Sequence, residues 1–307
     1  MTNVSATTSG KAGHLTRGKA VVGALLALVS VTIWAVWIVG TRQAVTVHLP
    51  LGWVGMLRFG LPALVLLPWW WRLGLLPQGI DRRLIALMVV GSGAPFLVVV
   101  ATGMRFAEAA QIGVLLPGTM PLFVALLSAV VDGERFTPSR IVGLALAVAA
   151  MLAIGGPALW AGQGIGLLLI PTGAFLWALY TIAFRRAGLD PMAAAGIIAA
   201  WSTILLLPLV AAENPLDFFA APPAILAAQV LSQFVLSGVL ALVSYGAAIG
   251  ILGTSRAAIF SALSPALAAL IAVPWLGEVP TALTIVGIAL AVAGVALGSG
   301  AIGFGRR

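Results

Sequence analysis

About ten runs of apolar residues, each near the length of a membrane-crossing helix, follow one another along the chain. A spanning helix needs roughly 20 predominantly apolar residues. Only helices and closed barrels satisfy their backbone hydrogen bonds in lipid, and barrel strands would alternate polar and apolar residues. The runs therefore predict an all-α integral membrane protein with ten transmembrane helices. The expected spans are 21–40, 54–71, 84–103, 109–131, 140–155, 166–184, 192–211, 231–249, 255–275 and 283–298.

The composition excludes several kinds of site. Hydrophobic residues make up 62% of the 307 residues and charged residues only 8%, whereas soluble domains carry roughly a quarter charged residues. The chain has no cysteine, which excludes disulfides, thiolate metal sites and cysteine nucleophiles. Its two histidines, His14 and His48, fall in the N-terminal tail and a predicted loop. We therefore expect no metal and no cofactor.

The net charge of +8 reflects topology rather than a nucleic-acid partner. With the N-terminus in the cytoplasm, thirteen of the 16 Lys and Arg residues fall on the cytoplasmic side of the predicted spans. Only Arg42 and Arg105 fall on the other side, and Arg58 lies inside the second span. This asymmetry follows the positive-inside rule. It predicts an even number of spans with both termini in the cytoplasm.

The sequence contains an internal repeat. Residues 115–150 reappear as residues 259–294, at a constant offset of 144. The matched positions are Pro121 and Pro265, Gly133-Glu134 and Gly277-Glu278, and the runs IVGLALAVA and IVGIALAVA. Five predicted spans lie in each half, and five is odd, so the second half must cross the membrane in the opposite sense. Inverted repeats of this kind are typical of transporters that give alternating access to a site between the halves.

The expected organisation has two halves of equal design. The first spans also match, because Trp34-Ala35-Val36-Trp37 with Arg42 corresponds to Trp177-Ala178-Leu179-Tyr180 with Arg185. The predicted parts are a disordered cytoplasmic tail at 1–20, a first five-helix repeat at 21–156, a linker at 157–164, a second five-helix repeat at 165–298 and a cytoplasmic tail at 299–307.

These features together resemble the drug/metabolite transporter superfamily and, within it, the EamA-like ten-helix exporters, most of all the YddG-type bacterial amino-acid exporters. The features are the two five-helix halves, the Trp34 to Trp37 motif with Arg42, Arg58-Phe59, and each repeated proline followed twelve residues later by Gly-Glu. The resemblance implies a central cavity surrounded by helices one to four and six to nine, with helices five and ten at the periphery. It also implies export of amino acids or small metabolites across the bacterial cytoplasmic (inner) membrane.

Polar and aromatic side chains inside the spans are candidates for lining that cavity. The candidates are Trp34, Trp37, Phe96, Trp177, Tyr180, Trp201, Ser244 and Tyr245. Trp34 and Trp177 lie near the predicted midplane, and each shares a helix face with an aromatic residue three positions on. Ordinary helix packing is the competing interpretation, and an interfacial aromatic belt explains the tryptophans near span ends.

Arg58 is the single charge within a span, about five residues from its start, or roughly 8 Å along the axis. It could hold a substrate carboxylate through a paired hydrogen-bond fork. The alternative is that its side chain extends to the outer headgroups. The sequence leaves both possibilities open.

No Asp or Glu lies in the central part of any predicted span. Proton-coupled carriers normally need a titratable group there, so we expect uniport or weakly coupled export of neutral and aromatic amino acids. Proton-coupled antiport and export of other metabolites or lipophilic drugs remain alternatives, as does a channel. An enzyme is not expected, because no intramembrane His, Cys or acidic pair is available. Glu134 and Glu278 end helices on opposite sides and are expected to be structural.

Two further patterns concern helix packing. Pro121 and Pro265 lie inside spans, where proline frees a carbonyl and bends the helix, so each is either a hinge or a static kink. Gly143 with Ala147, repeated as Gly287 with Ala291, forms stripes of small residues suited to close helix contact. The stripes predict packing within each half or at the interface of a weak homodimer. We expect a monomer or weak homodimer in the lipid bilayer, with a small-molecule substrate.

Overall fold

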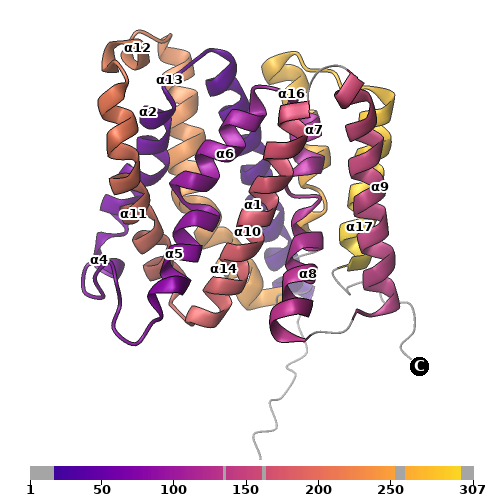
Figure 1. Ribbon diagram of the computed structural model, residues 1–307, viewed down its shortest axis with the longest axis horizontal. Helices are drawn as coiled ribbons and strands as arrows, with labels where there is room; N and C mark the ends of the chain where they lie inside the picture. Colours follow the sequence, from indigo (N-terminus) through magenta and orange to yellow (C-terminus); the bar gives the residue numbers. More distant parts are fainter. Residues whose placement is uncertain (1–16, 134–135, 161–163, 253–259, 299–307) are drawn as a thin grey trace, which may run out of the picture.

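A computed structural model describes residues 17–133, 136–160, 164–252 and 260–298, and all regular structure within these ranges is helical (Figure 1). The helices before residue 161 are α1 (Arg17–Thr46), α2 (Leu51–Gly55), η1 (Met56–Gly60), α3 (Leu61–Val65), α4 (Leu67–Trp70), α5 (Arg82–Ser92), α6 (Ala94–Met104), α7 (Ala109–Leu115), α8 (Met120–Asp132) and α9 (Pro138–Trp160). Those after it are α10 (Gly164–Ala187), α11 (Pro191–Ala212), α12 (Pro215–Phe219), α13 (Pro223–Gln229), η2 (Val230–Leu240), α14 (Ala241–Leu252), α16 (Ser264–Leu276) and α17 (Ala282–Gly298). Segments η1 and η2 are π-helical.

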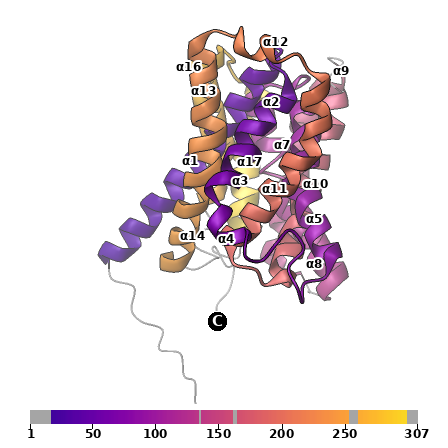
Figure 2. The same cartoon turned by 90° about the vertical axis from the view of Figure 1, so that its left-hand side faces the viewer.

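Many of these helices have the length and apolarity of membrane spans. Among the described residues, six helices are long and apolar enough to cross a membrane, and four apolar helices are shorter. The N-terminal turns of α1 extend away from the other helices in Figure 2, and Val21, Val22 and Leu25 there are at least half exposed. Exposed apolar surface of this kind suits contact with lipid. The buried core lies where α1, α6, α7 and α10 meet.

Helix ends differ from the predicted span ends. Helix α1 begins at Arg17 and continues to Thr46, so residues 17–20 are helical and not part of a disordered tail. Helix α9 continues to Trp160, well into the predicted linker at 157–164. At α1 the reason is that hydropathy marks where an apolar run ends, whereas the helix includes Arg17 and Lys19, whose long side chains can reach water.

The third predicted span is broken at Gly93, between α5 and α6. The backbone N–H of Ala94 donates to Ser202 Oγ of α11 at 3.0 Å, which supplies a partner for a donor that the break frees. A Cβ on Gly93 would lie 2.3 Å from the same oxygen. Glycine is therefore required for this close approach of α11.

The fourth predicted span is also interrupted, at residues 116–119 between α7 and α8. Pro121 is the second residue of α8, and Pro265 is the second residue of α16. Each proline follows a turn and begins a new helix, where its missing N–H costs nothing. Gly113 of α7 packs against Pro265, since a Cβ there would lie 3.0 Å from the proline Cα.

Helices α9 and α17 lie together at one edge of the bundle (Figure 1). They run antiparallel, because Gly287 meets Ile154 whereas Gly294 meets Gly143. A Cβ on Gly294 would lie 2.9 Å from the carbonyl oxygen of Gly143. The small-residue stripes therefore join the two halves of one chain. The prediction that they pack within a half or between two copies was wrong, because sequence spacing identifies a close-packing face but not its partner.

Candidate substrate-binding site

Arg58 lies on η1 and extends into the bundle. Its Nη1 donates to Ser237 Oγ of η2 at 2.7 Å, and its Cζ lies 4.7 Å from the centroid of the Trp37 ring. Its Nε is buried without a partner. Among the described residues no carboxylate pairs with Arg58. The Arg58 guanidinium thus contacts a neutral hydroxyl and an aromatic face, which leaves its charge available to bind an anion.

The π-helical turn that carries Arg58 has a local cause. In an α-helix the N–H of residue 62 would donate to the carbonyl of Arg58, but residue 62 is proline and has no N–H. The Leu61 N–H instead reaches back five residues to the Met56 carbonyl. Gly238 of η2 packs against Pro62, where a Cβ would lie 2.8 Å from the proline ring. Segments η1 and η2 therefore approach closely at Arg58, and π-helical turns are frequent at functional sites.

Five aromatic rings form a continuous column that begins beside Arg58. Trp37 stacks on Phe96 with 6.0 Å between ring centroids, and Phe96 lies 5.5 Å from Trp177. Trp177 contacts Tyr180 at 5.1 Å, and Tyr180 contacts Phe184 at 5.8 Å. This aromatic column joins α1, α6 and α10. It brings together four of the residues singled out from the sequence.

Trp34, Ser244 and Tyr245 lie in a separate contact between α1 and α14. The rings of Trp34 and Tyr245 are 4.9 Å apart. Ser244 Oγ lies 2.7 Å from Ser30 Oγ and donates to the Leu240 carbonyl at 2.8 Å. The Ser244 hydroxyl is thus occupied by helix packing in this conformation. None of these ring contacts and hydrogen bonds involves Arg58.

Trp201 of α11 also lies apart from Arg58. Its indole N–H donates to the carbonyl of Leu75, in the connection between α4 and α5, at 2.9 Å. Its ring packs on the buried cluster that contains Met88, as does the ring of Tyr180. Trp201 therefore holds the connection before α5 against α11, near the far part of the aromatic column.

Three polar residues at or just before the eighth predicted span were not among the site residues predicted from the sequence. Gln229, the last residue of α13, and Gln233 of η2 are completely buried. With Ser237 of η2 they form a line at four-residue spacing, which we call the η2 polar stripe. Gln233 Oε1 accepts the Trp37 indole N–H at 3.0 Å, and its Nε2 donates to Thr41 Oγ1 at 2.9 Å. The four-residue spacing of these polar residues could have indicated a shared helix face. The predicted span began at residue 231, however, and left Gln229 outside it.

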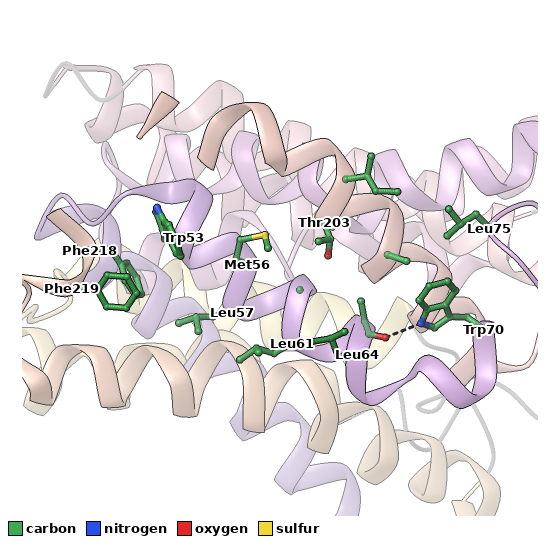
Figure 3. A pocket seen from close by; sticks show the side chains of 14 residues that line it. Trp53, Met56, Leu57, Leu61, Leu64, Trp70, Leu75, Thr203, Phe218 and Phe219 are labelled. Carbon is green, nitrogen blue, oxygen red and sulfur yellow. Dashed lines mark hydrogen bonds between the residues drawn. The ribbon is translucent and has the colours of Figure 1, made fainter. Parts of the chain in front are cut away.

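An apolar groove of about 490 Å³ lies on the other side of η1. Met56, Leu57 and Gly60 of the π-helical turn line it, and Arg58 does not (Figure 3). Opposite them are Ala200, Thr203 and Ile204 of α11. Its volume is in the range of small-molecule sites, but Thr203 carries its single hydroxyl. The groove offers no charge to a polar substrate.

At the C-terminal end of α1, an ion pair joins the two halves. Arg42 Nε lies 2.9 Å from Glu278 Oε1, just after α16, and Arg42 Nη1 donates to the Met104 carbonyl at 2.5 Å. Glu278 Oε2 accepts the Ala109 N–H of α7 at 2.6 Å. The Arg42 and Glu278 side chains are only 15% and 16% exposed. We call this the Arg42 end of the bundle.

Glu108 stands beside this pair, and its pKa is raised above 4.5. The main cause is desolvation by burial, and the charge of Glu278 adds to it, while Arg42 opposes the shift. Glu108 Oε2 is buried without a hydrogen-bond partner. No ion pair between Glu108 and the nearby Arg105 is found among the described residues.

A related ion pair stands at the opposite end of the bundle. Asp132, the last residue of α8, pairs with Arg185 and, at 2.9 Å, with Arg186 of α10. These arginine side chains are 51% and 46% exposed. The Arg42 end of the bundle is the end that carries α12, because Ala44, close to Arg42 on α1, packs with Phe218 of α12. Figure 1 shows α12 and the end of α8 at opposite ends of the bundle. We call this the Asp132 end. Glu134 and Arg135 lie outside the described residues.

A family model described as the EamA-like transporter family matches residues 21–156 and again residues 164–300. This chain belongs to that family. The EamA-like assignment, with the apolar helices, makes the protein a multi-pass membrane transporter and not an enzyme. The described residues contain no group of three or more His, Cys, Asp or Glu side chains that could hold a metal ion.

Two individual proteins resemble this EamA-like chain over most of its length. A protein of Streptantibioticus cattleyicolor named "Probable terminal-alkyne amino-acid exporter" is 32% identical over 227 residues, which are 72% of this chain and 74% of that protein. A crystal structure at 20% identity matches with a TM-score of 0.63 over 92% of this chain and 98% of the other. The second likeness concerns the fold alone.

Proposed function

We propose that this EamA-like transporter exports neutral and aromatic amino acids, with the substrate carboxylate on Arg58 and the side chain along the aromatic column. The observation that carries the proposal is Arg58 itself, a cation inside the bundle with an unpartnered Nε and no carboxylate partner among the described residues. A buried charge is costly unless it is paired. A substrate carboxylate would supply the missing charge and accept a paired hydrogen-bond fork.

The relative's name supports the same substrate class. A terminal-alkyne amino acid combines the zwitterionic head of every amino acid with a small apolar side chain. An Arg beside stacked aromatic rings suits that combination. The aromatic column begins next to Arg58 at Trp37 and leads through Phe96 and Trp177 to Tyr180.

The proposed architecture is ten spans in two inverted five-helix repeats, with both termini in the cytoplasm of the bacterial inner membrane. The double match to the family model supports the two halves, and the antiparallel α9 and α17 support their opposite orientation. In this topology the Arg42 end faces outside and the Asp132 end faces the cytoplasm. Alternating access would open one end at a time, with the helix breaks before Pro121 and Pro265 as the hinges.

The proposed transport is uniport or weakly coupled. Every Asp and Glu lies outside the central part of the predicted spans. At the Arg42 end, Glu278 pairs with Arg42 and Glu108 lies beside that pair. Uptake into proteoliposomes with and without an imposed pH gradient tests this proposal, and uptake that strictly requires the gradient would show proton coupling instead.

Flux in proteoliposomes tests the substrate and the role of Arg58 together. We expect saturable transport of L-phenylalanine and little transport of phenethylamine, which has the same ring and amine but no carboxylate. Losing a charge-assisted hydrogen bond costs roughly 1.5–3 kcal/mol, so Arg58→Gln should lower kcat/KM for phenylalanine at least about tenfold. The matched control is Arg72→Gln, which removes an exposed Arg after α4 and should leave flux unchanged. Equal flux of phenylalanine through wild type and Arg58→Gln contradicts the proposal.

Export of lipophilic drugs is the second candidate, because the groove beside η1 is almost wholly apolar. The same flux panel therefore includes a lipophilic cationic drug. Transport of the drug without transport of amino acids would favour this second function. Flux that does not saturate would indicate a channel.

A further inference from the structure

Gln233 is a neutral amide completely buried within the bundle. Burying an amide without hydrogen bonds costs several kcal/mol in principle, so its position must be explained by its partners. Its oxygen accepts from Trp37 Nε1 at 3.0 Å, and its nitrogen donates to Thr41 Oγ1 at 2.9 Å and to Gln229 Oε1 at 3.3 Å. All of these partners lie on α1 or on the η2 polar stripe.

The orientation of the Gln233 amide is fixed by these bonds. Because the nitrogen has two acceptors in Thr41 and Gln229, the oxygen must face Trp37. Gln229 is itself held, since its Nε2 donates to the Gly40 carbonyl at 2.8 Å. Gly40 allows the close approach of α1 and η2, because a Cβ there would lie 2.7 Å from Ser232 Oγ. The chain of bonds thus ties η2 to α1 at one defined register.

The group that Gln233 holds is the ring beside Arg58. Trp37 is 6% exposed, and its indole N–H is its single hydrogen-bond donor. Its ring lies 4.7 Å from the Arg58 Cζ and 6.0 Å from the Phe96 ring. A rotation of the indole would remove the surface on which the guanidinium rests.

We propose that Gln233 is a positioning residue of the amino-acid site, which holds the Trp37 ring under Arg58 and so fixes the direction in which Arg58 offers its free Nε to a carboxylate. This inference rests on the proposed function. Gln233 acts through Trp37 and Arg58 and does not itself contact the substrate. Its replacement should weaken substrate binding and leave the later steps of transport intact.

The test is a double-mutant cycle on phenylalanine flux with Gln233→Met and Trp37→Phe. Each single variant removes the hydrogen bond between Trp37 and Gln233, and Trp37→Phe also replaces the indole beside Arg58 by a smaller ring. We expect each to raise KM about tenfold with the maximal rate within about twofold, and the double variant to be no worse than the poorer single variant, since residues that share one interaction are not additive. Gln229→Met is the matched comparison, with the same chemical change one turn away. It removes one of the two acceptors of the Gln233 nitrogen but leaves the bond from Trp37 to the Gln233 oxygen, and should raise KM less than Gln233→Met.

The outcomes separate this inference from the proposed function. Absence of saturable amino-acid flux in the wild type means that the proposed function is wrong. If the wild type transports, an unchanged KM in Gln233→Met overturns the inference, as do KM effects that multiply in the double variant or an equal rise in Gln229→Met. If Gln233→Met is not recovered folded, as judged by size-exclusion chromatography, Trp37→Phe decides alone, and a wild-type KM in that variant overturns the inference.

Discussion

The two ends of the bundle carry ion pairs of the same connectivity in unlike surroundings. At each end, an Arg from the first long helix of one half meets an acid at the end of the fourth span of the other half. Arg42 and Glu278 are about 15% exposed, whereas Arg185 is 51% exposed. The conformation described here is therefore tightly packed at the Arg42 end and solvated at the Asp132 end.

The difference in exposure between the two ion pairs follows from where each acidic residue stands relative to the glycine that ends its helix. Gly133 and Gly277 both end a helix in the left-handed conformation, with φ of 68° and 72°, which glycine adopts at little cost. Asp132 precedes its glycine and stays on the helix surface, whereas Glu278 follows its glycine and turns back toward Arg42 and the Ala109 N–H. The same helix end thus produces an exposed pair or a buried one.

Breaking the buried pair should give the largest effect. Glu278→Gln removes the charged partner of Arg42, which keeps the Met104 carbonyl and the neighbouring Glu108, and loss of one partner of a buried pair costs roughly 3–5 kcal/mol. We expect a clear fall in the thermal unfolding temperature of the purified protein in detergent. An unchanged unfolding temperature would show that the two ends do not differ in strength.

Replacing both partners should be milder than the two single losses predict. In Arg42→Gln with Glu278→Gln neither member of the pair keeps its charge without the other. The summed losses in unfolding free energy of the two single variants should therefore exceed the loss in the double variant by about 1–3 kcal/mol. A double-mutant cycle on thermal stability measures this coupling. Simple additivity would mean that Arg42 and Glu278 act independently.

Breaking the exposed pair should have a small effect. Asp132→Asn removes an acid whose partners are about half exposed, and exposed ion pairs contribute roughly 0–1 kcal/mol. The difference from wild type should shrink further at 1 M salt, where charges are screened within about 3 Å. A loss as large as that of Glu278→Gln would contradict the contrast between the ends.

The Arg42 end should also show a dependence of stability on pH that arises from Glu108. Its folded-state pKa is raised, so the fold favours the protonated form, and stability falls as pH rises from 4.5 through the raised pKa. Glu108→Gln removes the charge and keeps an oxygen for the cap of α7. The variant should be slightly more stable than wild type at pH 7, with the gain lost near pH 4.5. A gain that is equal at both pH values would exclude this cause.

Part of the site could be predicted because it depends on position along one helix. Trp37 and Tyr180 occupy matched places in the two halves, and with Phe96 and Trp177 they do meet in one column. Large rings inside apolar helices must pack against something, and their spacing shows which face they share. Arg58 was identified because a charge within an apolar run has few explanations.

The rest depends on which helices meet, and single-sequence reasoning does not supply that. Gln229 and Gln233 were overlooked because a hydropathy window averages two amides away among Leu, Val and Ala. Trp34 and Trp177 hold the same place in the repeat and contact corresponding spans of the opposite halves, since Trp34 contacts Tyr245 on the eighth span and Trp177 contacts Phe96 on the third. That these spans meet follows from the packing of α14 on α1 and of α6 on α10, which no spacing within α1 or α10 reveals.

The most direct test of the account is equilibrium binding of L-phenylalanine and phenethylamine to the purified wild type and to Arg58→Gln. Isothermal titration calorimetry on protein in nanodiscs provides the dissociation constants. We predict that the wild type binds phenylalanine at least about tenfold more tightly than phenethylamine, as a charge-assisted contact implies, and that Arg58→Gln binds both equally. An Arg58→Gln variant that still prefers phenylalanine to the same degree would contradict the assignment of Arg58 as the carboxylate site.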